Sequence, residues 1–154
     1  MIERYAAHLL LIAVTLWVGA LWAIGFIAAP TLFAMIPDRS LAGNVAGRLF
    51  ELTGWIGIGC AAWILLHAYA VHRGAMFRNR IVGVVMLMLV ASLATQFWIQ
   101  PLMVQMKLEV LPLEVMASRL AERFARWHGI SSLIYVAQSV LGLILVGGAR
   151  RLMR

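Results

Sequence analysis

The chain has 154 residues, of which 64% are hydrophobic and only 12% are charged, and its formal net charge is +7. A soluble domain carries about 25% charged residues, so this composition excludes an ordinary soluble enzyme or binding domain. The basic residues lie in short clusters between long apolar runs. That pattern indicates membrane topology and contact with anionic lipid, and it argues against a nucleic-acid partner.

The first apolar run extends over residues 5–33, and His8 is the one residue in it that could carry a formal charge near neutral pH. It begins like a secretory signal, with Arg4 followed by apolar residues. A secretory apolar region is only about 7–15 residues long, however. We therefore interpret this run as a retained first transmembrane helix.

Three further apolar runs follow, over residues 52–71, 81–103 and 127–148. A helix needs about 20 apolar residues to cross a bilayer core, and each of these runs has roughly that length. None alternates with the period of two that a membrane barrel requires. The sequence predicts an all-α integral membrane four-helix bundle, as a single transmembrane domain over residues 1–154, with no convincing internal repeat.

The connections between these runs carry helix signals of their own. Pro37 to Ser40 predicts a turn, with Asp38 or Ser40 capping a short helix over residues 40–51. Pro101 and Pro112 flank a break after the third run. Residues 113–126 then alternate apolar and charged side chains at helical spacing, which predicts an additional amphipathic helix between spans three and four.

Orientation follows from lysine and arginine in the connections. With four spans, both termini and the second connection share a side, which holds Arg4, Arg73, Arg78, Arg80, Arg150, Arg151 and Arg154. The opposite side holds six cations, several of them within the charge-mixed amphipathic segment. Because the first set lies tight against the spans, we expect both termini in the cytoplasm and the chain in the cell inner membrane.

Several motifs together resemble the bacterial branch of the family that includes transmembrane protein 205. They are Leu16-Trp17-Val18-Gly19, Ala29-Pro30-Thr31-Leu32-Phe33, Ile36-Pro37-Asp38-Arg39, Trp98-Ile99-Gln100-Pro101 and His128-Gly129-Ile130-Ser131-Ser132. The resemblance implies a small multi-pass membrane protein, and the animal member is associated with tolerance to platinum drugs. It supplies no catalytic residues to carry over.

Two histidines are candidate cofactor ligands. His8 lies one turn into the first predicted helix, and His67 lies about one turn before the end of the second. Both are expected near the cytoplasmic leaflet, where two neutral imidazoles on neighbouring helices could ligate a b-type haem. Cys60, the single cysteine, lies seven residues before His67 and could instead join it in a metal site.

Polar side chains form two stripes at helical spacing in the later spans. The stripe residues are Ser92, Gln96 and Gln100 in the third span, and His128, Ser131, Tyr135 and Gln138 in the fourth. They could line a polar path, but such residues more often form hydrogen bonds between helices. We favour the packing interpretation.

A soft-metal site is a further hypothesis. Met103, Met106 and Met116 lie in or near the connection that precedes His128, and thioether and imidazole ligands suit soft ions such as Cu(I). The alternative is that these methionines simply fill the bundle.

No phosphate-cradling loop or nucleophile motif occurs, so a non-enzymatic role is predicted. The primary hypothesis is handling of, or tolerance to, a small solute or metal ion. The alternatives are a b-haem-binding redox subunit and a structural subunit of a larger membrane complex. The expected partners are the lipid bilayer and either further copies of the chain or other membrane subunits.

Overall fold

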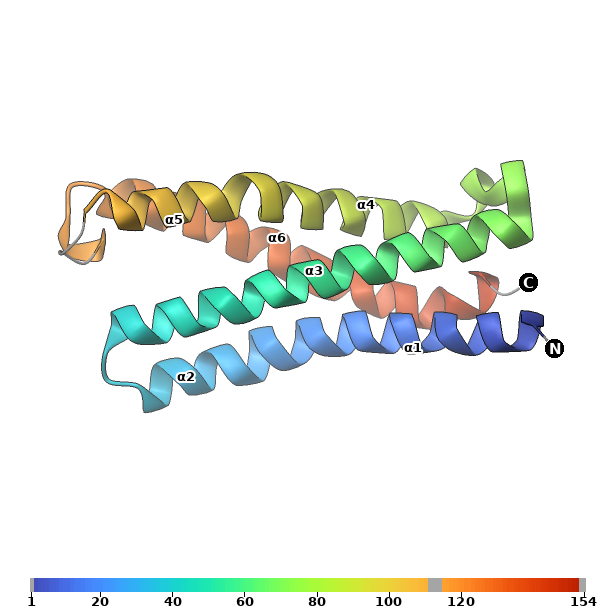
Figure 1. Ribbon diagram of the computed structural model, residues 1–154, viewed down its shortest axis with the longest axis horizontal. Coiled ribbons are helices and arrows are strands. Elements are labelled where there is room, and N and C mark those ends of the chain that lie inside the picture. Colours follow the sequence, from blue (N-terminus) through green and yellow to red (C-terminus); the bar gives the residue numbers. More distant parts are fainter. Residues whose placement is uncertain (1, 111–114, 153–154) are drawn as a thin grey trace.

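The computed structural model describes residues 2–110 and 115–152, and the helices in those ranges form four long antiparallel rods (Figure 1). In chain order the elements are α1 (Ile2–Ala23), π-helix η1 (Ile24–Ala28), α2 (Ala29–Met35), α3 (Arg39–His72), 3₁₀-helix η2 (Arg73–Arg78), α4 (Arg80–Ala94), π-helix η3 (Thr95–Ile99), α5 (Gln100–Leu108), 3₁₀-helix η4 (Val115–Ala117), α6 (Ala121–Gly148) and 3₁₀-helix η5 (Ala149–Leu152).

Four of the resulting helical segments are long and apolar enough to cross a membrane. They are Tyr5–Met35, Arg39–Arg78, Arg80–Leu108 and Ala121–Leu152. Helices suit this composition because lipid offers no partner to a backbone N–H or C=O, and a helix satisfies both internally. The predicted all-α four-helix architecture is confirmed, and it is that of a multi-pass membrane protein.

Two short helices predicted in the connections are not separate elements. Residues 40–51 belong to α3, which starts where Asp38 Oδ1 accepts hydrogen bonds from the backbone N–H groups of Ser40 and Leu41, at 2.9 and 3.0 Å. Of the two predicted capping residues, Asp38 and Ser40, Asp38 is therefore the cap. No helix breaker interrupts the chain between this cap and the apolar run, so one helix of 34 residues forms.

The amphipathic segment also differs from the prediction. Residues 113 and 114 lie outside the described residues, 115–117 form one 3₁₀ turn, and 121–126 are the first residues of α6. Ser118 causes the break, because its hydroxyl donates to Val115 O (2.6 Å) and accepts from Leu120 N (3.1 Å). These local bonds compete with a continuous helix. No breaker then separates residues 121–126 from the apolar run.

A π-helix precedes a proline in two of the four rods. Ile24–Ala28 comes before Pro30, and Thr95–Ile99 comes before Pro101. Proline lacks the N–H that an α-helix interior requires, and a widened turn is one way to accommodate that loss. Each rod therefore continues past its proline, and the two halves of the chain share a feature that the sequence did not reveal as a repeat.

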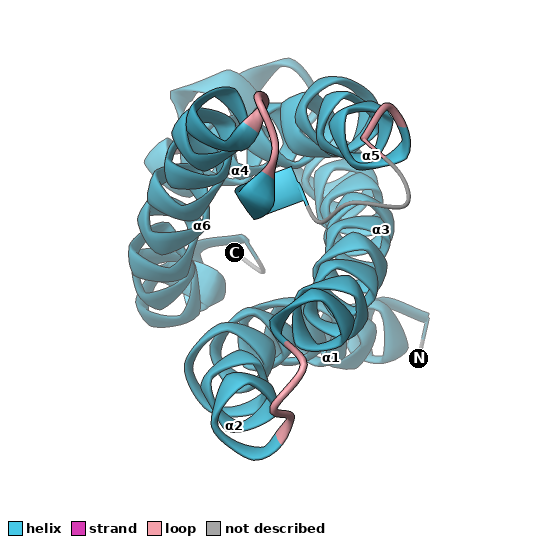
Figure 2. Cartoon of the chain, turned by 90° about the vertical axis from the view of Figure 1, so that its left-hand side faces the viewer, coloured by secondary structure: helices cyan, strands magenta, loops and turns pink. Residues whose placement is uncertain are grey.

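The four rods surround a narrow apolar core (Figure 2). α1 packs against α3 and α6, and α4 also packs against α3 and α6, which closes the ring. Trp17, Leu10, Ile64, Met88 and Leu145 are fully buried at its centre. Both termini and the α3–α4 connection lie at one end of the bundle, which we call the termini end (Figure 1). The α2–α3 and α5–α6 connections lie at the other, the loop end.

Candidate functional site

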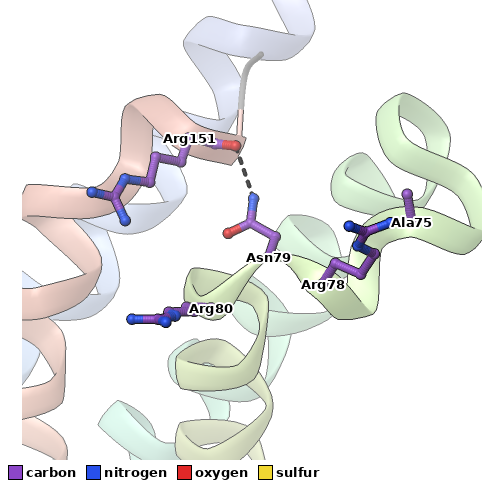
Figure 3. A pocket seen from close by; sticks show the side chains of 5 residues that line it. All are labelled: Ala75, Arg78, Asn79, Arg80 and Arg151. Atoms are coloured by element: carbon purple, nitrogen blue, oxygen red, sulfur yellow. Dashed lines mark hydrogen bonds between the residues drawn. The ribbon is translucent and has the colours of Figure 1, made fainter.

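A shallow, open pocket of about 430 Å³ lies at the termini end, where the α3–α4 connection meets the last helical turn of the described chain (Figure 3). Its lining residues are Ala75, Arg78, Asn79, Arg80 and Arg151. Ala75 and Arg78 come from η2, Arg80 is the first residue of α4, and Arg151 belongs to η5. The pocket thus joins two segments that are far apart in the sequence.

Asn79 holds these segments together. Its Oδ1 accepts a hydrogen bond from Ile81 N at 3.0 Å, which caps α4, and its Nδ2 donates to Arg151 O at 2.9 Å. Beneath this contact Gly148 packs so closely on Ile81 that a methyl group at the glycine would collide with it. In Figure 3 the side chains of Arg80 and Arg151 extend to one side of Asn79, and Arg78 lies on the other side near Ala75.

The electrostatics of the pocket favour an anion. The three arginines are exposed, and the described residues that line the pocket include no aspartate or glutamate. The two ion pairs between described residues, Arg48–Glu51 and Arg126–Glu122, include none of them. The N-terminus of α4 adds partial positive charge. Guanidinium groups match phosphate oxygens in paired hydrogen bonds, so Arg80 and Arg151, which extend to the same side of Asn79, could hold a phosphate-type oxyanion.

Two features of this site were missed by sequence reasoning. The arginines were interpreted as signals of topology and of contact with anionic lipid, not as the lining of a pocket, and Asn79 was not singled out. An asparagine directly before a predicted helix, between Arg78 and Arg80, is a recognisable cap signal. The meeting with Arg151 had no signal, because that residue lies 72 positions further along the chain.

The polar stripes mainly make contacts between helices. Ser92 Oγ donates to Gln138 Oε1 at 3.0 Å, and both residues are buried between α4 and α6. Tyr135 donates its hydroxyl to Leu21 O at 2.6 Å. Buried Gln96 donates from Nε2 to Glu51 O at 3.0 Å. These bonds support the packing interpretation for the residues that make them.

The remaining stripe residues, Gln100, Ser131 and His128, make no hydrogen bond between helices in the described part of the chain. Gln100 and Ser131 are half-buried, and His128 is exposed with its ring stacked on Phe124 at a centroid distance of 6.2 Å. The side-chain oxygen of Gln96, Oε1, is buried and has no hydrogen-bond partner.

The two predicted haem ligands lie in different environments. His67 is buried, and its Nε2 has no hydrogen-bond partner. His8 is exposed, whereas neighbouring Leu10 and Trp17 on α1 are fully buried in the core. The indole Nε1 of Trp63, one turn before His67, is also buried without a partner. Haem ligation by His8 and His67 stays a prediction.

The predicted soft-metal residues also differ in exposure. Met106 is buried at 2% exposure, Met103 is half-buried, and His128 is exposed. Met116 is exposed in η4, and Cys60 is buried. In the described ranges, no cluster of three or more histidine, cysteine or carboxylate side chains is arranged to hold a metal ion. A site built on thioether ligands stays a prediction.

Comparison with known families gives one match. A family described as "Domain of unknown function (DUF4149)" matches residues 12–111. The matched range contains Arg78, Asn79 and Arg80 but ends before α6 and Arg151. No curated protein and no solved structure matches the chain.

Proposed function

The chain belongs to the DUF4149 family, and we propose that it handles a small phosphate-type anion at the pocket formed by Arg78, Asn79, Arg80 and Arg151. The proposal narrows the small-solute hypothesis raised by the sequence. It includes a location in the cell inner membrane with both termini in the cytoplasm, and kinship with the transmembrane protein 205-like proteins.

Charge distribution supports this orientation. The described arginines of the termini end, Arg73, Arg78, Arg80, Arg150 and Arg151, are all exposed beside the apolar rods. Six basic residues lie at the loop end, but several of them belong to the charge-mixed segment of residues 119–126. The termini-end arginines lie directly beside the spans, as arginine and lysine do in cytoplasmic connections. The pocket then faces the compartment that holds soluble phosphate compounds and the anionic leaflet.

One observation carries the proposal: three arginines from two distant segments line one pocket, and none of its described lining residues is an aspartate or glutamate. Topology alone requires basic residues near the spans, but it does not require that Arg151 be fastened to the α4 cap by Asn79. Clustered cations repel one another, and a bound anion removes that repulsion.

Binding of inorganic phosphate to the detergent-purified protein tests the proposal. We expect phosphate affinity to fall about tenfold in Arg80→Gln and again in Arg80→Gln/Arg151→Gln, since each lost charge-assisted bond is worth at least about 1.4 kcal/mol. Arg123→Gln, an exposed arginine at the loop end, is the matched control. Equal affinities in the wild type, the double variant and the control would refute anion binding at this pocket.

A second candidate, b-type haem binding at His67, is favoured by the buried Nε2 that has no hydrogen-bond partner. Neutral imidazole is a common haem ligand. A Soret band in the purified protein that is lost in His67→Ala and in His8→Ala would support ligation by the pair. A colourless preparation that contains no iron would remove this candidate.

A further inference from the structure

We propose that the anion held at this pocket is the headgroup phosphate of an anionic membrane phospholipid, whose acyl chains lie along the outer faces of α4 and α6. This inference rests on the proposed function, because it names the source of the phosphate group that the arginines bind. It adds an apolar half to the site.

The pocket lies where membrane-length segments end, which is the level at which lipid headgroups are expected. Two of the membrane-length segments meet at it, since one ends at Arg78 and the next begins at Arg80. Arg151 lies one residue before the end of the fourth segment. Basic pockets between helices at this level are suited to phospholipid headgroups.

On α4 and on α6, exposed apolar side chains lie between the pocket and the middle of the helix. Leu87 follows Arg80 by seven residues, and Ile144 precedes Arg151 by seven. Seven residues make about two helical turns, so each pair shares a face of its helix and is separated by about 10 Å along the axis. Leu87 is 57% exposed and Ile144 is 49% exposed. A lipid with its phosphate at the arginines would place its chains over these residues.

The 3₁₀-helix η2 adds an interfacial anchor beside the pocket. Phe77 precedes Arg78 and is 72% exposed, while its neighbour Met76 is buried in the bundle. An exposed phenylalanine beside an arginine is unfavourable in water but suits the boundary between headgroups and acyl chains. A soluble phosphate would use the arginines alone, whereas a phospholipid would also use Phe77, Leu87 and Ile144.

Native mass spectrometry of the detergent-purified protein with two matched lipids tests this inference. Dioleoyl phosphatidylglycerol and dioleoyl phosphatidylcholine have the same chains and differ in net headgroup charge. We expect one phosphatidylglycerol molecule per chain to be retained at least about tenfold better than phosphatidylcholine. That preference should disappear in Arg80→Gln/Arg151→Gln and persist in the loop-end control Arg119→Gln/Arg123→Gln.

A second pair of variants tests the apolar half. Leu87→Ser/Ile144→Ser should reduce retention of phosphatidylglycerol severalfold and leave binding of inorganic phosphate unchanged. Both residues are half-exposed, so the helical circular dichroism of this variant should match that of the wild type.

The outcomes separate the two proposals. If inorganic phosphate binds with dependence on Arg80 and Arg151 while the two lipids are retained equally, the lipid inference is overturned and the proposed function stands. Retention of phosphatidylglycerol that is insensitive to the arginine variants, together with no arginine-dependent phosphate binding, overturns both.

Discussion

Replacing Gly57 by alanine tests how closely α1 approaches α3. Gly57 is buried and faces the indole of Trp17, which is only 1% exposed. A methyl group at Gly57 would collide with Trp17 Nε1 and would lie 3.0 Å from Cε2 and 3.1 Å from Cδ1. Trp17 is enclosed by the core and cannot retreat without disturbing it. Overpacking of this kind costs about 1–3 kcal/mol.

Gly59→Ala is the matched control, because a methyl group there would have no neighbour within 4 Å. Both substitutions gain the same helix propensity, at most about 1 kcal/mol. The difference between the two variants therefore isolates the steric effect, and we expect Gly57→Ala to be less stable than Gly59→Ala by about 1–3 kcal/mol. Reversible unfolding in mixed micelles with increasing dodecyl sulfate, followed by far-ultraviolet circular dichroism, measures both. Equal unfolding free energies would show that Trp17 does not pack on Gly57.

Two further changes test the interior polar groups. In a double-mutant cycle, Ser92→Ala and Gln138→Leu should show a coupling free energy of about 0.6 kcal/mol, and not more than about 1.7, as membrane hydrogen bonds do. Ser132→Ala is the control, because the Ser132 hydroxyl donates only to a carbonyl of its own helix at 2.9 Å, and it should show no coupling to Ser92→Ala or to Gln138→Leu. A coupling free energy of zero between Ser92→Ala and Gln138→Leu would contradict the hydrogen bond between these two side chains. His67→Leu, made in protein purified without haem, should raise the free energy of unfolding by about 1 kcal/mol, because it removes a buried nitrogen that has no partner. A large loss of stability in that variant would instead indicate a partner for the imidazole.

The arginines of the termini end can serve both membrane topology and anion binding. The same arginines that indicate a cytoplasmic end by their position beside the spans also line a pocket, where Asn79 joins η5 to the start of α4. Asn79→Asp keeps the oxygen that caps the helix and removes the amide that donates to Arg151. It therefore separates helix capping from assembly of the pocket.

The sequence was sufficient to predict the four membrane-length helices and to limit the cap of α3 to Asp38 or Ser40. Each prediction depends on neighbouring residues alone, since a helix in lipid satisfies its backbone hydrogen bonds within itself. The prediction of an amphipathic helix after the third span was wrong where the hydrogen bonds of a single side chain interrupt the helix. Ser118 ends the 3₁₀ turn at residues 115–117, and no helical periodicity reports that effect.

Only the tertiary structure decided which face of each helix points inward. Leu10 is fully buried, whereas Leu9 and Leu11 on either side are 48% and 42% exposed. Lipid tails are as apolar as a leucine core, so the hydrophobic pattern carries no record of the inner face. Close approaches such as Gly57 on Trp17 and Gly148 on Ile81 set the rotation of the helices instead. The rotation of each helix buries His67, exposes His8 and brings Arg151 to the pocket. The sequence could not predict this rotation, because contacts between residues far apart in the chain determine it.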